Sequence, residues 1–179
     1  MKITLIRHAK VDYQFKLWYR ALEFDEAVKG YDESPIHMDL TKEFGDLEGS
    51  LYVSGLQRTH ETAKLVFPQM QYTEDRLFDE IPARAFTKIS VRLPGLVWLL
   101  MARIQWYLES EKQLETRKES KARAMCAVDV LEACEEQQVT LICHGLFMRV
   151  LVRELQRRGY QLKSKATYGN LDEICLGKD

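Results

Sequence analysis

Short apolar runs alternate with amphipathic stretches along this chain. The runs at residues 2–7, 50–54, 70–74, 139–143 and 171–176 predict strands, and their nearly continuous apolar character is typical of a sheet that is covered on both faces. A helical period marks residues 56–66, 94–111, 117–137 and 145–158. Residues 29–49, which contain Gly, Pro and Asp at short intervals, predict a long loop.

Strands that alternate with helices predict the fold class. We expect an α/β protein, a three-layer α/β/α sandwich around a mainly parallel central sheet. Ligands of such sheets bind outside the carboxyl ends of the strands. The chain has 179 residues and shows no internal repeat or linker-like tract, so we expect a single domain over residues 1–179.

Charge and composition exclude several classes of partner. The chain has 26 basic and 27 acidic residues, so no overall field attracts nucleic acid. Its most apolar window, residues 96–101, reaches Arg103 too soon to span a membrane. The four cysteines form no C-x-x-C pair, and the N-terminus does not resemble a signal peptide. We therefore expect a cytoplasmic protein with no nucleic-acid or membrane partner.

Polar residues follow three of the predicted strands and should meet at one edge of the sheet. They are Arg7 and His8, Ser54 and Arg58, and His144. Ser54 and Gln57 have the spacing of a capping box, which predicts that a helix begins near residue 55 with Arg58 in its first turn. An arginine beside a helix N-terminus forms an anion site, and phosphate suits it because a guanidinium can bind two oxygens at once.

Three short segments resemble a known family. RHAK (7–10), SGLQRTHETA (54–63) and HG (144–145), in this order, are similar to the motifs of the histidine phosphatase superfamily, which includes cofactor-dependent phosphoglycerate mutase. The resemblance implies a phosphoglycerate mutase-like fold. It also implies that His8 is the nucleophile and forms a phosphohistidine. Arg7, Arg58 and His144 would then bind the phosphate, with His144 also part of the catalytic group.

The resemblance implies a general acid in the segment RLFDEIPA (76–83). Glu80 is the expected acid and Asp79 is the alternative, because the spacing after Arg76 allows either. A neutral imidazole can attack phosphorus in line while arginines stabilise the charge on the phosphoryl oxygens. We therefore expect a metal-independent phosphomonoesterase with no cofactor and a small phosphorylated substrate.

Departures from the family pattern leave alternatives open. Ala9 replaces the usual glycine, and Gln14 stands near an asparagine position of the mutases. The chain also looks too short to enclose a mutase site, which favours hydrolysis. Phosphoglycerate mutase-type transfer and a non-catalytic module that binds a phosphorylated ligand remain alternatives. Cys143 and Arg149 form a C-x5-R match to cysteine-dependent phosphatases, but bulky residues lie between them. No close-spaced pair of metal ligands is present.

Two loops should determine which substrate binds. In residues 9–49 and 81–111, Lys10 and Gln14 are the main candidates for substrate contacts. Further candidates are Trp18, Tyr19 and Arg84. The apolar segment 93–108 is expected to pack into the core, with a homodimer patch or a wall of the substrate pocket as alternatives.

Overall fold

A six-stranded sheet forms the centre of the protein in a computed structural model that describes residues 1–38, 42, 44, 45 and 47–178. The strand order is β4 (Thr73–Glu74), β3 (Ser50–Val53), β6 (Gln138–Cys143), β1 (Lys2–Arg7), β8 (Glu173–Gly177) and β7 (Gln161–Leu162). The first four are parallel, and β8 and β7 are antiparallel to their neighbours. The predicted mainly parallel sheet is confirmed.

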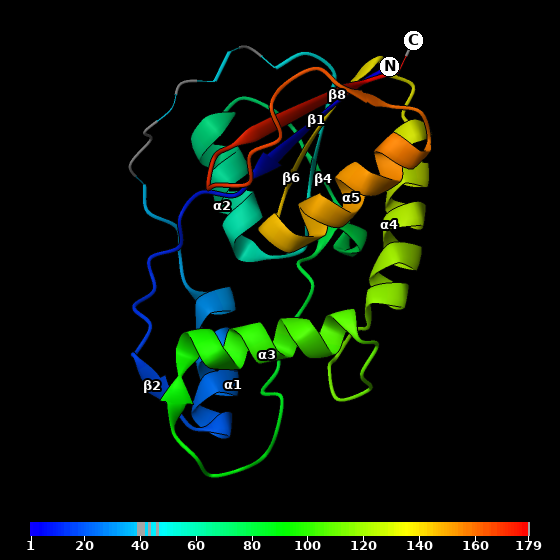
Figure 1. Cartoon of the computed structure of the whole chain (residues 1–179). Helices are drawn as coiled ribbons and strands as arrows, with labels where there is room; N and C mark the ends of the chain where they lie inside the picture. Colours follow the sequence, from blue (N-terminus) through cyan, green and yellow to red (C-terminus); the bar gives the residue numbers. More distant parts are fainter. Residues whose placement is uncertain (39–41, 43, 46, 179) are drawn as a thin grey trace.

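Helices cover both faces of this sheet (Figure 1). Helix α2 (Gln57–Val66) packs on one face, where Ile6 and Ile142 belong to the same core cluster as its Ala63. Helices α4 (Arg117–Glu132) and α5 (Gly145–Arg157) cover the other face, where Leu5 of β1 belongs to the same core cluster as Leu151 of α5. Alternate side chains of each strand thus serve two apolar layers, as the three-layer sandwich requires.

A smaller unit lies beside the sandwich. It contains α1 (Ala21–Glu33), α3 (Gly95–Tyr107) and a two-stranded sheet of β2 (Trp18–Tyr19) and β5 (Leu93–Pro94). We call residues 15–33 and 93–107 the cap. Trp98 is fully buried at its centre, packs against Phe24 and Phe86, and donates from Nε1 to the Tyr19 carbonyl at 2.9 Å. In Figure 1 the cap lies below the sandwich, with α1 and α3 crossing each other.

Several predicted elements differ from the observed ones. Helix α1 was not predicted, and it includes residues 29–33 of the predicted loop; residues 39–41, 43 and 46 of that loop lie outside the described residues. Helix α3 ends at Tyr107 instead of residue 111, because Glu109 takes a positive φ of 60°. Helix α4 ends at Glu132 instead of residue 137, and the strand expected at 70–74 contains only Thr73 and Glu74.

The apolar segment 93–108 is only partly core. Trp98, Ala102 and Trp106 of α3 are buried, whereas Leu96, Leu100 and other apolar side chains of the helix contact solvent. Within the described part of the chain, none of the helices combines the length and the apolar character needed to cross a bilayer.

Candidate active site

The carboxyl ends of β3, β6 and β1 converge because these neighbouring strands run parallel. Arg7 is paired with Cys143, and the His8 N–H donates to the Cys143 carbonyl at 3.0 Å. The ring centroids of His8 and His144 are 5.1 Å apart. The structure thus brings together Arg7, His8, Arg58 and His144, which the sequence spreads over more than 130 positions.

His8 is held as a neutral imidazole in one tautomer. Its side chain is buried, and Nδ1 lies 2.7 Å from the carbonyl oxygen of Ala9. A carbonyl accepts hydrogen bonds, so Nδ1 carries the hydrogen and the lone pair is on Nε2. Burial, reinforced by the nearby charges of Arg58 and Arg7, lowers the pKa of His8 to about 3. The imidazole is therefore uncharged at neutral pH.

His144 is also buried and neutral, but both of its ring nitrogens are occupied. Arg58 Nε donates to His144 Nδ1 at 3.1 Å, so Nε2 carries the hydrogen and donates to Ser54 Oγ at 2.6 Å. Burial, followed by the charge of Arg58, lowers the pKa of His144 well below its ordinary value. The ring is thereby fixed between α2 and the end of β6.

The predicted capping box at Ser54 and Gln57 is wrong. Helix α2 has Leu56 as its N-cap residue. The Ser54 hydroxyl accepts the Leu56 N–H at 3.2 Å and contacts His144, while the Gln57 side chain donates to Glu61 at 2.6 Å. A buried hydroxyl requires partners, and Ser54 finds them in His144 Nε2 at 2.6 Å and Thr59 Oγ1 at 3.1 Å. Arg58 still lies in the first turn, as predicted.

Arg58 is buried and paired with an aspartate of the cap that was not predicted as a site residue. Its Nη1 donates to Asp32 Oδ1 at 2.7 Å, and its guanidinium lies 5.2 Å from the ring centroid of Tyr31. Both partners lie in the last turn of α1. The carboxylate of Asp32 stabilises a guanidinium that is otherwise out of contact with water. The sequence contains no local signal for this pair, because α1 itself was missed.

Arg7 is held through one guanidinium nitrogen, while another lacks a partner in the described part of the chain. Its Nη1 donates to the Tyr168 carbonyl at 2.5 Å, whereas the buried Nε has no hydrogen-bond partner among the described residues. Gly145 makes room for this group, since a Cβ there would lie 3.1 Å from Arg7 Nε. Arg7 lines the same cavity as His8. An arginine that lines the same cavity as a neutral histidine is suited to binding an anionic oxygen.

The two candidate acids occupy different environments. Glu80 accepts the N–H groups of Leu146 and Phe147, at 3.2 and 3.0 Å, in the first turn of α5, and its own Oε1 also accepts the Ile81 N–H at 2.9 Å. Asp79 accepts the Gly55 N–H at 2.7 Å. Burial raises the pKa of Asp79. Both carboxyls line the cavity.

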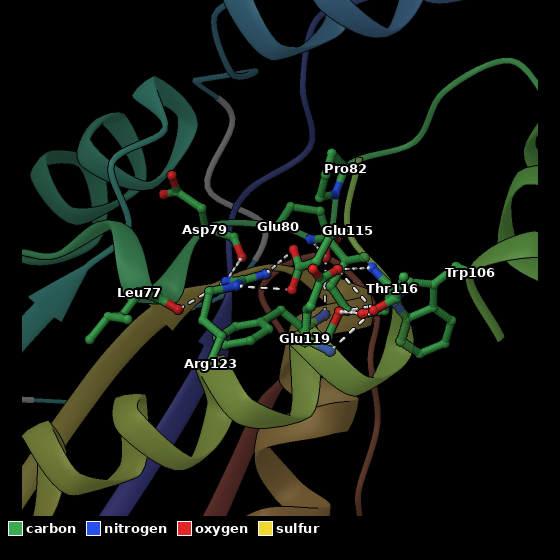
Figure 2. A network of polar contacts seen from close by, with 12 residues as sticks. Leu77, Asp79, Glu80, Pro82, Trp106, Glu115, Thr116, Glu119 and Arg123 are labelled. Carbon is green, nitrogen blue, oxygen red and sulfur yellow. Dashed lines mark hydrogen bonds and ion pairs between the residues drawn. The ribbon is translucent and has the colours of Figure 1, made fainter. Parts of the chain in front are cut away.

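Arg123 of α4 holds the segment that carries these acids. Figure 2 shows its guanidinium between two groups of oxygens: Nη1 donates to the carbonyls of Leu77 and Asp79, and Nε and Nη2 bind both carboxylate oxygens of Glu115. The guanidinium also lies 4.0 Å from the ring centroid of Phe147. The position of Asp79 therefore depends on a helix that contributes no group to the predicted site.

A cavity of about 830 Å³ joins the strand ends to the cap. Of the residues expected to contact substrate, Tyr19 lines it. Lys10 and Gln14, both described in the structure, are exposed and lie outside it, as do Trp18 and Arg84. Residues 10–12 pair with residues 35–37. The expected substrate contacts of Lys10 and Gln14 stay a prediction.

The rival chemistries have little geometric support. Cys143 is fully buried, and burial strongly raises the pKa of its thiol, so the thiolate that a cysteine nucleophile needs is not formed at neutral pH. Among the residues that the structure describes, no three His, Cys, Asp or Glu side chains gather in a way that could hold a metal ion.

The fold and the site together define a phosphoglycerate mutase-like α/β protein with a histidine and arginine pocket at its strand ends. The sequence matches the histidine phosphatase superfamily (branch 1) over residues 3–172. The chain therefore belongs to this superfamily, which confirms the resemblance of its motifs. None of the curated protein sequences matches it significantly.

Solved structures share the fold at low sequence identity. A mycobacterial glucosyl-3-phosphoglycerate phosphatase has a TM-score of 0.57 and 18% identity, covering 98% of this chain and 92% of its own. A phosphoserine phosphatase from Entamoeba histolytica has a TM-score of 0.53 and 15% identity, covering 97% and 89%. A putative alpha-ribazole-5'-P phosphatase from Escherichia coli has a TM-score of 0.52 and 16% identity, covering 87% and 79%.

Proposed function

We propose that this protein is a phosphomonoesterase that works through a phosphohistidine on His8. The observation that carries the proposal is the state of His8: a buried neutral imidazole, with Nδ1 bound to the Ala9 carbonyl and the lone pair on Nε2. It lines a cavity that Arg7 and Arg58 also line. Membership of the superfamily and the names of the structural neighbours agree with this reading.

The reaction has two displacements. His8 Nε2 attacks the phosphorus, the bond to the ester oxygen breaks with its electron pair going to that oxygen, and a carboxylic acid donates the proton that releases the alcohol. The guanidinium groups of Arg7 and Arg58 stabilise charge on the remaining phosphoryl oxygens. The resulting carboxylate then deprotonates a water that attacks the phosphohistidine, which releases inorganic phosphate and restores His8.

The acid in this proposal is Asp79 in place of the expected Glu80. Both oxygens of Glu80 accept backbone N–H groups, which gives this side chain a structural role at the start of α5. Asp79 accepts a backbone N–H through Oδ1, and burial raises its pKa, the direction that a general acid requires. Its carboxyl also lines the cavity that holds His8.

We also propose that the reaction needs no metal, because Arg7 and Arg58 supply the positive charge that a divalent cation supplies elsewhere. A cytoplasmic setting is part of the same proposal. The four cysteines are all free thiols in the structure, and Cys126 is exposed, as suits a reducing compartment.

The test is hydrolysis of p-nitrophenyl phosphate in EDTA by the wild type, His8→Ala and Cys143→Ser. We expect the wild type and Cys143→Ser to release phosphate and His8→Ala to be inactive. Rapid quenching into alkali, which preserves phosphohistidine, should trap the phosphate on the peptide that contains His8. Full activity of His8→Ala, or phosphate trapped on a residue other than His8, would overturn the mechanism. Loss of activity in EDTA that returns with added metal would overturn metal independence.

A further inference from the structure

The cavity has two chemically different ends. The strand ends supply the charged groups Arg7, Arg58, Asp79 and Glu80. The cap supplies a wall that is mostly apolar, composed of Phe15, Leu17, Tyr19, Phe24, Val28, Leu96 and Leu99. The phosphate end is fixed by His8, so a leaving group bound to that phosphate must extend past the acids toward this wall.

Apolar side chains of the cap are left in contact with solvent around this cavity. Leu96 is 76% exposed and Leu99 is 40% exposed, although the same helix buries Trp98 completely. Leu17 and Phe15, on the facing segment, are also exposed. Large apolar residues gathered around one concave surface are typical of a ligand-binding site, since a bound apolar group would remove them from water.

Several polar groups near this wall are bound within the protein, although the exposed Lys16 also lines the cavity. The Tyr19 hydroxyl accepts the Lys16 N–H. Arg103 donates from Nη1 to the carbonyls of Ile81 and Pro82, at 2.9 and 3.1 Å. Glu115 is bound through both oxygens to Arg123. A hydroxyl of the leaving group that lay against the apolar side chains of this wall would lose its hydrogen bonds to water, which is unfavourable.

We propose that the cap end of the cavity is the leaving-group site of this enzyme and that its substrates are phosphate monoesters of apolar alcohols or phenols. The inference rests on the phosphomonoesterase activity proposed above. It assigns Leu96 and Leu99, together with Phe15 of the same cavity lining, to binding of an alkyl or aryl group. It also accounts for apolar side chains on α3 that the cap core does not use.

A series of n-alkyl phosphates tests this assignment. Ethyl, butyl, hexyl and octyl phosphate release alcohols of nearly equal acidity. The series therefore changes the length of the alkyl group that can be buried and keeps the reactivity of the ester constant. We expect kcat/KM to rise by up to about fourfold for each methylene that the wall covers. Propyl phosphate should also be a better substrate than glycerol 1-phosphate, which has the same carbon chain with two hydroxyls.

Two variants of α3 localise the site. Leu99→Asn should flatten the dependence of kcat/KM on chain length and lower the value for octyl phosphate by roughly tenfold. Leu100→Asn is the matched control: this neighbour is 56% exposed and lies outside the cavity lining, so the wild-type dependence should persist.

Each outcome separates the two proposals. Turnover that does not depend on chain length, or a preference for glycerol 1-phosphate, would overturn the apolar site and leave the phosphomonoesterase intact. An equal loss of chain-length dependence in Leu100→Asn would overturn the assignment to Leu99. Failure of the wild type to release phosphate from any ester, p-nitrophenyl phosphate included, would overturn the proposed activity and this inference with it.

Discussion

Asp79 and Glu80 are adjacent carboxylic acids with different hydrogen-bond partners. If Asp79 protonates the leaving oxygen, Asp79→Asn should lower kcat/KM, which reports the step that releases the alcohol, by about 10²–10⁴-fold for ethyl phosphate. The loss with p-nitrophenyl phosphate should be much smaller, because p-nitrophenolate leaves without a proton. Phosphate release from both esters is the measurement. Glu80→Gln is the comparison; if it shows the larger substrate-dependent loss, Glu80 is the acid.

The buried histidines should make the fold sensitive to acid. The pKa of His8 is about 3 in the folded protein against 6.5 in the unfolded chain, so between these values the unfolded chain binds more protons. The free energy of unfolding therefore falls as the pH drops below about 7, and His8 alone should contribute about 2 kcal/mol of loss by pH 5. His144, whose pKa is also lowered, acts in the same direction.

Urea unfolding at pH 7 and pH 5 measures this effect. His8→Asn cannot take up the proton, so its loss of stability between the two pH values should be about 2 kcal/mol smaller than that of the wild type. His37→Asn, at a histidine with a partly exposed side chain, should retain the wild-type difference. Equal pH dependence of His8→Asn and the wild type would contradict the lowered pKa.

At the residue scale, the sequence predicted groups that lie directly at strand ends. Arg7, His8 and His144 follow β1 and β6, so identifying the strands was enough to bring them together. Asp32 and Arg123 were missed because their roles depend on distant partners. Asp32 reaches Arg58 from the cap, and Arg123 binds backbone carbonyls, which any residue can provide and which leave no trace in a sequence.

At the element scale, α4 contacts residues 77–80, the segment that carries the two candidate acids, and this contact can be tested directly (Figure 2). Arg123→Lys keeps the positive charge but cannot reach both carbonyls and both oxygens of Glu115. We expect a loss of about 1–3 kcal/mol in the free energy of unfolding. We also expect a larger fall in kcat/KM for ethyl phosphate than for p-nitrophenyl phosphate, because Asp79 is less well positioned to protonate the leaving oxygen.

The control for Arg123→Lys is Arg117→Lys, at the start of the same helix. Arg117 pairs with Glu109 at the surface, where such a pair contributes less than about 1 kcal/mol. Equal effects of the two substitutions on stability would show that Arg123 does not position the acid. The same conclusion would follow if Arg123→Lys lowered the activity toward ethyl phosphate and p-nitrophenyl phosphate by the same factor.

Element prediction succeeded where one apolar face was continuous. Helix α5 was predicted within one residue at its end because Met148, Leu151, Val152 and Leu155 form a regular stripe. Helix α1 was missed because it buries only Ala21, Phe24 and Ala27, and because Gly30 in its last turn resembles the start of a loop. The apolar ring that completes its packing comes from Trp98, more than 60 residues later in the chain.

At the scale of the whole molecule, α3 belongs to two cores. Trp98 lies in the apolar cluster of the cap, whereas Trp106, two turns further on, lies in the main cluster of the sandwich and donates to Ser120 Oγ of α4 at 2.9 Å. The helix thereby connects the wall of the cavity to the layer that holds the acid-bearing segment. Neither connection follows from the sequence, since α3 is apolar around much of its circumference and its period does not show which side is buried.

Truncating each tryptophan should therefore disturb a different part of the protein. Trp98→Ala removes the centre of the cap, and a loss of about 3–5 kcal/mol should accelerate amide hydrogen exchange in α1 and α3. It should also abolish the preference for long alkyl phosphates, because the apolar wall loses its support. Trp106→Ala should accelerate exchange mainly in α4. If both variants instead accelerate exchange equally throughout β1 and β6, the cap and the sandwich unfold as one cooperative unit, which would contradict the separate roles assigned to the two tryptophans.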